Sequence, residues 1–220
     1  MTDTKGPSPA DPRLWLLVTS LALIAAIHAG LALLLTNTVT DRFLLREGEL
    51  AQQFLNGVLK AENSGSHLFD TPAPSAALQS FSHHVENLPG TVRANVYSLD
   101  GFIRFSTERN LIGLQFPDNE ELTEAAKGQL ISKLDKAFDN DKPEHLAINR
   151  FKGDELVEAY IPVNDVDGKI VAVVEFYREP ELMKQTVADI RRIIWAAAGL
   201  SGLILFVALG LAVTFGARRM

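Results

Sequence analysis

The residues of this chain best suited to chemistry are polar side chains that recur at every second position of strand-like segments. Arg93, Asn95 and Tyr97 alternate with apolar residues, and a period of two places such side chains on one face of a strand. Arginine forms bidentate, charge-assisted hydrogen bonds with carboxylates. The sequence therefore predicts a binding site for a small molecule, with organic acids as the first candidates, formed by Arg93, Asn95, Tyr97, Arg104, Ser106, Tyr160 and Tyr177.

The same residues have a simpler interpretation as a solvated sheet face. Arg93 would then pair with Glu108, and Arg104 with Glu175. Tyrosines on a sheet more often pack than bind ligands, so the sequence leaves both interpretations open.

Metal binding and catalysis have little support in the sequence. His83 and Glu86 lie one helical turn apart next to His84, but a structural zinc site needs four ligands, and two surface histidines are the preferred interpretation. The chain has no cysteine and no recognisable nucleophile, zinc-hydrolase or phosphate-loop motif. The carboxylates are expected on helix and loop surfaces. We therefore expect no enzyme, no metal and no cofactor.

Two hairpins are predicted to carry the polar residues. Residues 92–99 and 102–107 flank Asp100-Gly101, a strong two-residue turn signal. The predicted pairs are Leu99 with Phe102, Tyr97 with Arg104, Asn95 with Ser106, and Arg93 with Glu108.

The second predicted hairpin joins residues 156–164 to 169–177, with Asn164 opposite Lys169. This register gives one uniformly apolar face, made of Val157, Ala159, Ile161, Val163, Ile170, Ala172, Val174 and Phe176. The other face is mixed and carries Glu158, Tyr160, Val171, Val173, Glu175 and Tyr177.

Helices are expected before, between and after the hairpins. Apolar residues near a spacing of 3.6 (Val39, Phe43, Leu50, Phe54 and Val58) indicate a helix over residues 37–62, expected to cover the apolar sheet face. Further helices are expected over 72–87 and 118–127, a strand over 129–136, and a helix opened by Pro180.

Two apolar runs, residues 14–35 and 193–215, are long enough to cross a bilayer as helices. The first run exceeds a typical signal-peptide core and lacks a clear cleavage site, so an uncleaved anchor is expected. Arg13, Arg218 and Arg219 favour cytoplasmic termini, although Arg191 and Arg192 blur this signal. The outer domain would then lie on the extracytoplasmic side of the membrane.

The predicted organisation is a tail over 1–13, a span over 14–35, an outer domain over 36–192, a second span over 193–216 and a short end over 217–220. The outer domain carries 17 Lys/Arg and 25 Asp/Glu, a net charge of −8, which disfavours nucleic acid. Small residues recur every fourth position in both spans, as in Ala22, Ala26 and Gly30, which suits close helix packing or arises by chance. His28 in the first span is interpreted as a neutral histidine facing the other helices or the interface.

The order of these elements resembles the extracytoplasmic single Cache sensor, a PAS-like family of bacterial receptors. The likeness covers about residues 37–190 and rests on the segments 96–106, 112–113, 126–128 and 160–174. It implies an α+β fold, with a PAS-like antiparallel sheet, a long N-terminal helix and two flanking transmembrane helices. Family members commonly precede histidine kinases or other output domains, whereas this sequence stops at Met220.

The resemblance implies a membrane-anchored sensor that binds a small ligand and passes a conformational signal through the second span. Homodimerisation through the first helix and the spans, contact with membrane lipid, and a separate cytoplasmic kinase or other output protein are expected. The alternative is a structural or assembly protein whose outer domain contacts another protein.

Overall fold

A computed structural model of the chain describes residues 12–61, 69, 76–116, 118–136 and 155–216. The predicted tails over 1–11 and 217–220, and the start of the helix expected from residue 72, lie outside the described residues. Two compact units emerge: residues 41–184 form one, and the helical segments up to Thr40 and from Gln185 form the other.

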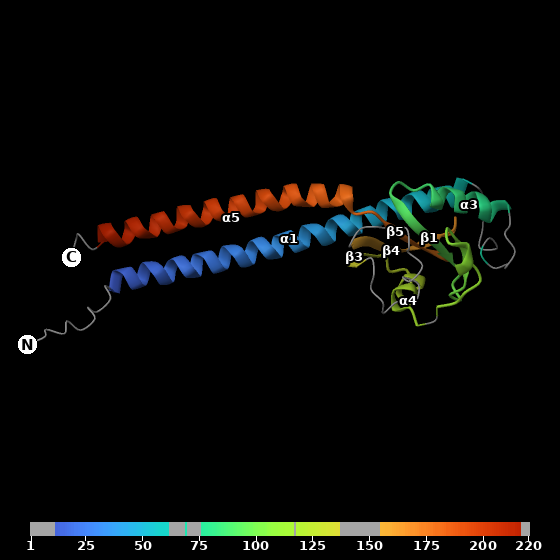
Figure 1. Cartoon of the computed structure of the whole chain (residues 1–220), viewed down its shortest axis with the longest axis horizontal. Coiled ribbons are helices and arrows are strands. Elements are labelled where there is room, and N and C mark those ends of the chain that lie inside the picture. The colour runs from blue at the N-terminus through green and yellow to red at the C-terminus, as the bar shows by residue number, and fades with distance from the viewer. Residues whose placement is uncertain (1–11, 62–68, 70–75, 117, 137–154, 217–220) are drawn as a thin grey trace, which may run out of the picture. The chain divides into compact units, whose positions relative to one another are not determined.

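The outer unit is built on an antiparallel sheet of five strands in the order β2-β1-β5-β4-β3 (Figure 1). The strands are β1 (Thr91–Tyr97), β2 (Ile103–Ser106), β3 (Ile131–Lys136), β4 (Glu155–Asn164) and β5 (Ile170–Arg178). Helices α3 (Ala76–Glu86) and α4 (Glu120–Ala126) and the short 3-10 turn η1 (Arg109–Leu111) complete the described part of this unit. The predicted α+β class is confirmed, with a long N-terminal helix beside an antiparallel sheet.

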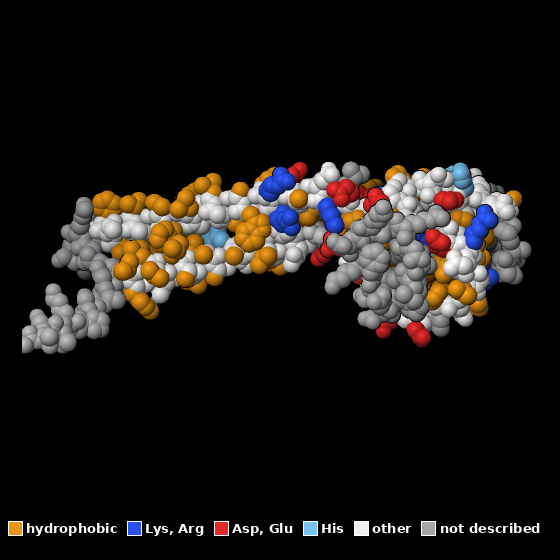
Figure 2. Space-filling model, viewed as in Figure 1, with side chains coloured by type: hydrophobic (Ala, Val, Ile, Leu, Met, Phe, Trp, Pro, Cys, Tyr) orange, Lys and Arg blue, Asp and Glu red, His pale blue; other side chains and the backbone are white. Residues whose placement is uncertain are grey.

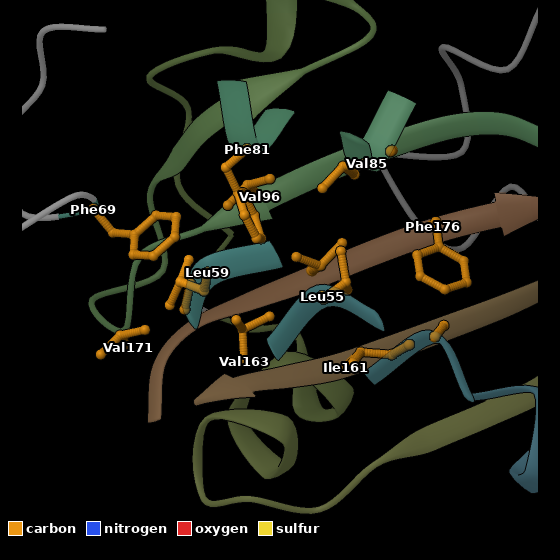
Figure 3. Close-up of a cluster of buried hydrophobic side chains, with 14 of the residues drawn as sticks. Leu55, Leu59, Phe69, Phe81, Val85, Val96, Ile161, Val163, Val171 and Phe176 are labelled. Atoms are coloured by element: carbon orange, nitrogen blue, oxygen red, sulfur yellow. The ribbon is translucent and has the colours of Figure 1, made fainter. Parts of the chain in front are cut away.

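The helix α1 (Pro12–Ala61) runs without a break from the first apolar run into the outer unit. Its last turns pack on the apolar sheet face through Ala51, Leu55 and Leu59. Figure 3 shows Leu55 and Leu59 beside side chains from the strands and α3, in a core completed by Phe81, Val96, Ile161, Val163, Val171 and Phe176. The expectation that the long helix covers this face is confirmed.

The residues of α1 that meet the sheet are not those of the most obvious apolar repeat. Leu50 and Phe54 are 46% and 45% exposed, whereas Leu55 and Leu59 are fully buried. The helix therefore has a second apolar stripe next to the one that packs. Periodicity identified the helix correctly, but it could not select which of two neighbouring stripes faces the core.

The first hairpin departs from the predicted register at one point. Asn95 pairs with Ser106 as expected, but Tyr97 pairs with Ile103 because the register shifts after Val96. The predicted Tyr97–Arg104 pair is therefore wrong: a bulge inserts one extra residue on β2. Gly101, with φ of 84°, adopts the positive φ that the turn at Asp100-Gly101 requires.

The second hairpin keeps its predicted faces despite a shifted register. Val163 pairs with Ala172, and Asn164 pairs with Ile170 instead of Lys169. Along most of the hairpin the shift is two residues, and an even shift leaves those side chains on their original face. The apolar face therefore remains as predicted for Ala159, Ile161, Val163, Ala172, Val174 and Phe176, all of which lie in the core. Val171 is the exception: it was predicted on the mixed face, but it lies in the hydrophobic core, close to the register irregularity at Asn164.

The other predicted helices and the weak strand are present within a few residues of their expected bounds. The predicted strand over 129–136 is β3 (Ile131–Lys136), and α4 begins after Asn119, whose side chain accepts a hydrogen bond from the Leu122 amide. Helix α5 (Glu181–Gly216) starts directly after Pro180 and extends through the second apolar run. By length and composition, α1 and α5 are the two described helices able to cross a membrane.

Candidate functional site

A buried network of polar side chains covers the sheet face opposite the hydrophobic core. Six of the seven predicted site residues belong to it: Arg93, Asn95, Tyr97, Ser106, Tyr160 and Tyr177. All three tyrosines of the chain are among them. None of these six side chains is more than 2% exposed, so the face is not the solvated surface of the alternative interpretation.

Two glutamates, Glu158 on β4 and Glu175 on β5, are the acceptors at the centre of the network. Both are 0% exposed. Glu175 accepts hydrogen bonds from the Asn95 side-chain amide at 2.5 Å and from the Tyr97 hydroxyl at 2.9 Å, both at Oε2. The expectation that carboxylates lie on helix and loop surfaces is therefore wrong for this pair. Because burial of an unpaired carboxylate is very unfavourable, Glu175 can be buried only with such donors.

The Tyr177 hydroxyl links the two glutamates. Its oxygen lies 2.6 Å from Glu175 Oε1 and 3.0 Å from Glu158 Oε1. A phenol has one hydrogen, so Tyr177 donates to one carboxylate at a time. The arrangement thus has two alternative hydrogen-bonding states that differ only in which glutamate receives the bond.

The network continues to α4 through Tyr160. The Asn119 side-chain amide donates to the Tyr160 hydroxyl at 2.9 Å, and that hydroxyl donates to Glu158 Oε1 at 3.1 Å. The Oδ1 atom of Asn119 also caps α4 by accepting from the Leu122 amide at 2.8 Å. A single asparagine therefore couples the start of α4 to the buried carboxylate.

The opposite end of the network reaches the edge strand β2. The Ser106 hydroxyl donates to Asn95 Oδ1 at 2.6 Å and accepts from the Glu108 amide at 2.9 Å. Hydrogen bonds therefore run from β2 through β1 and β5 to β4. A displacement of any one of these strands would therefore change the hydrogen bonds of the other three.

Two cations offset the carboxylates. The guanidinium of Arg93, 1% exposed, lies 4.3 Å from the centroid of the Tyr177 ring. Lys133 on β3 lies 3.3 Å from Glu158 Oε2 and also pairs with Glu121 of α4. Lys133 also lies 3.5 Å from Asp135, so three carboxylates share it, and its positive charge reduces the cost of burying Glu158.

The environment also changes the tyrosines. Burial, reinforced by the negative charge of Glu175, raises the pKa of Tyr160 well above its ordinary value. Burial and the charges of Glu175 and Glu158 raise the pKa of Tyr177 in the same direction, partly opposed by Arg93. Both phenols therefore remain hydrogen-bond donors across the physiological pH range.

Arg104 lies outside this network. Its Nε donates to the Ser98 hydroxyl at 3.1 Å, and a terminal nitrogen lies 3.5 Å from Asp100. The bulge after Val96 explains this position, because it gives Ile103 the place opposite Tyr97. The suggested ion pair of Arg104 with Glu175 is replaced by the pair with Asp100.

Four members of the network were not predicted as site residues: Asn119, Lys133, Glu158 and Glu175. The sequence did contain a signal for the glutamates, since Glu158 and Glu175 stand two residues before Tyr160 and Tyr177 and so share their sheet face. Asn119 and Lys133 come from separate elements, and only the fold brings them near.

The histidines of α3 contact their own helix, and His84 also lies beside Phe54 of α1, with ring centroids 6.5 Å apart. A His84 ring nitrogen lies 2.9 Å from the Ser80 carbonyl oxygen, and the His83 and His84 ring centroids are 6.4 Å apart. Among the described residues, no group of three or more His, Asp or Glu side chains could hold a metal ion. Two further histidines of the chain, His67 and His145, lie outside the described residues.

No protein-family model matches the chain, and a sequence search of curated proteins finds no relative. The solved structures similar to it include the sensor domain of Escherichia coli DcuS, at 16% identity and a TM-score of 0.31, covering 76% of this chain and 98% of that one. The periplasmic sensory domain of the Campylobacter jejuni chemoreceptor Tlp1 is 10% identical, with a TM-score of 0.36, over 74% of this chain and 62% of that one.

An extracellular ligand-binding receptor from Desulfohalobium retbaense is 14% identical, with a TM-score of 0.41 over 68% of this chain. The match spans 25% of that receptor. Two of these structures are sensor domains, and the third is a ligand-binding receptor.

Proposed function

We propose that this chain is the input module of a bacterial signal-transduction receptor, anchored in the inner membrane by two spans with its outer domain in the periplasm. A small ligand would bind at the polar sheet face. The observation that carries the proposal is the position of the Glu158–Tyr177–Glu175 bridge. Tyr177 lies at the end of β5, four residues before the first residue of α5, the helix that contains the second apolar run.

The network supports a sensor because it has two alternative hydrogen-bonding states. Tyr177 can donate to Glu175 or to Glu158, and a ligand that hydrogen-bonds one glutamate would favour donation to the other. A ligand shifts an equilibrium only through its different affinity for two states. Here the change in the hydrogen bond of Tyr177 would shift β5, and the covalent chain would transmit this shift to α5.

The polar face also indicates what such a ligand must do. Apart from the Lys133 side chain, which is 35% exposed, the cluster is buried, so binding requires this face to open and the ligand to replace hydrogen bonds that the side chains now make to one another. Arg93 and Lys133 supply positive charge for an organic acid, as the sequence suggested. The two glutamates require that the ligand also offer a donor, such as a hydroxyl or an ammonium group.

A thermal-shift screen tests the proposal. The full chain in detergent would be melted with small organic acids, hydroxy acids, amino acids and amines, following the circular dichroism of the sheet. A ligand at 100 times its dissociation constant adds about 2.7 kcal/mol, which raises the midpoint of a domain of this size by roughly 5–10 °C.

Two arginine variants locate the site. The shift should disappear in Arg93→Gln, which changes the network, and persist in Arg104→Gln, which changes an arginine outside it. Each variant is compared with its own ligand-free midpoint, so a loss of basal stability does not obscure the result. A shift retained in Arg93→Gln and lost in Arg104→Gln would exclude this site, and no shift across the panel would favour the second candidate.

The second candidate is a protein-contacting module, favoured by the exposed pair Leu50 and Phe54 on α1. The same pair would serve the homodimer expected of a receptor. Light scattering of the full chain in detergent distinguishes the cases, with Leu99→Glu, at an exposed leucine of the first hairpin, as the control. If the chain is a dimer that dissociates in Phe54→Glu but not in Leu99→Glu, the result supports the receptor dimer. If the unchanged chain is a monomer, the result supports a contact between this surface and another protein.

A further inference from the structure

The apolar segments of α1 and α5 lie side by side in one compact unit (Figure 1), and hydrophobic side chains cover them (Figure 2). Between them is a groove with a cavity volume of about 350 Å³. Small residues from both helices line it, among them Ala25, Ala29, Ala198 and Gly202, together with the rings of Trp195 and Phe206. The volume lies in the range of small-molecule sites.

One polar side chain, His28, also lines this groove. Its Nδ1 atom lies 2.8 Å from the backbone carbonyl oxygen of Ile24. A carbonyl oxygen only accepts, so Nδ1 carries the hydrogen in this contact. In the neutral ring the other nitrogen, Nε2, is then an acceptor, and the structure records no partner for it among the described residues.

The depth of His28 restricts what can reach it. His28 is seven residues before Leu35, where the first apolar run ends, which places it ~10 Å inside a hydrocarbon layer of about 30 Å. A phospholipid headgroup stays at the surface and cannot supply a hydrogen-bond donor there. An ionisable side chain at this depth costs free energy, and such residues often bind a ligand or a partner group.

We propose that this groove binds a lipid-soluble quinol, with a ring hydroxyl donating to Nε2 of His28 and the ring lying against the small residues near Trp195. Such a molecule combines an apolar body, which enters the hydrocarbon layer, with the donor that Nε2 lacks. The groove is partly open, so the alkyl tail can extend into the lipid. The proposal concerns binding without electron transfer, and it is independent of ligand binding by the outer domain.

The site discriminates between the two redox forms. A quinol has hydroxyl donors, whereas the oxidised quinone has only carbonyl acceptors, which cannot bond to an acceptor nitrogen. A several-fold preference for the reduced form is therefore expected. Occupancy of the groove would depend on the redox state of the membrane pool.

Retention of decylubiquinol by the full chain in phospholipid nanodiscs tests the proposal, with empty nanodiscs as the background. The nanodiscs are immobilised and equilibrated with the reduced or the oxidised compound, and the bound amount is extracted and measured by absorbance. We expect saturable retention of the quinol above background, and several-fold weaker retention of decylubiquinone.

Two substitutions and one matched control locate the site. A Cβ atom at Gly202 would already contact the His28 ring at 3.5 Å, so Gly202→Leu fills the groove, whereas a Cβ atom at Gly210 on the same helix meets nothing within 4 Å. Retention should fall at least tenfold in Gly202→Leu and be unchanged in Gly210→Leu. Retention should also fall several-fold in His28→Leu, which replaces the hydrogen-bond acceptor with an apolar side chain.

Three results would overturn the proposal. Retention equal to that of empty nanodiscs would show that lipid or a helix of a second copy fills the groove. Equal retention in Gly202→Leu and the unchanged chain would place binding elsewhere. Loss in Gly202→Leu without any effect of His28→Leu, or a preference for the oxidised compound, would refute the hydrogen bond to Nε2. Far-UV circular dichroism establishes that each variant keeps its helices.

Discussion

The two faces of the outer sheet are held by different forces. On one face, Val96, Ile161 and Phe176 pack against Leu55 of α1 in a core without charge. On the other face, Asn95, Glu158 and Glu175 are equally buried but are joined by hydrogen bonds. Both faces exclude water, so burial alone does not distinguish them.

The difference between the faces shows how each responds to change. An apolar contact is non-directional, and its loss costs free energy in proportion to the area and the cavity left behind. A hydrogen bond between buried polar groups adds only a modest net free energy, but leaving one partner unsatisfied costs more. The loss of free energy on substitution is therefore set by cavity size on the apolar face and by unsatisfied hydrogen-bonding groups on the polar face.

The largest effect is expected on the apolar face. Leu55→Ala removes a fully buried side chain from α1 and should lower the free energy of unfolding by about 2–5 kcal/mol. Leu50→Ala on the same helix removes an exposed leucine and should cost less than about 1 kcal/mol. Urea titration of the full chain in detergent, followed by the circular dichroism of the sheet, measures both. Equal losses in the two variants would contradict the assignment of the packed stripe.

A smaller effect is expected from removing one hydroxyl on the polar face. Tyr177→Phe removes the hydroxyl that lies 2.6 Å from Glu175 Oε1, while Glu158 Oε1 keeps the hydrogen bond from Tyr160, and it should cost about 1–3 kcal/mol. Tyr97→Phe is the matched control: it removes a donor from Glu175 Oε2, to which the Asn95 amide still donates. Its loss should be smaller, about 0.5–1.5 kcal/mol. A larger loss in Tyr97→Phe would show that Tyr177 is not the central bridge.

The third prediction concerns pH and only the polar face. It has no effect near neutral pH and appears as a loss of stability in alkaline solution. The pKa values of Tyr160 and Tyr177 are raised on folding, so the folded state keeps protons that the unfolded state releases above about pH 10. Stability is therefore complete below pH 10 and falls as the pH rises further, by up to about 1.4 kcal/mol per pH unit for each tyrosine.

Urea midpoints at pH 8.0, 9.5 and 10.5 check this pH dependence. Tyr177→Phe should reduce the slope by about half and Leu50→Ala should leave it unchanged, because only the first removes a titrating group. If the phenolate absorbance of Tyr160 and Tyr177 appears near pH 10 in the folded protein, the pKa assignment is wrong.

The sequence determined the features that depend on pattern alone. The period of two placed Asn95, Tyr97, Tyr160 and Tyr177 on the face opposite the apolar core, and this survived a two-residue shift in the second hairpin because an even shift preserves faces. Hydropathy determined the two long apolar helices, since the length of an apolar run is read directly from the residues.

The tertiary structure decided what depends on contacts between distant segments. The bulge after Val96, a local choice between pairings of similar energy, moved Arg104 out of the network and brought Ile103 opposite Tyr97. Burial of Glu158 and Glu175 is acceptable only because Asn95, Tyr97, Tyr177 and Lys133 converge on them from three strands. No local pattern encodes that convergence, because the free energy that makes it possible arises from donors up to 80 residues away in the chain.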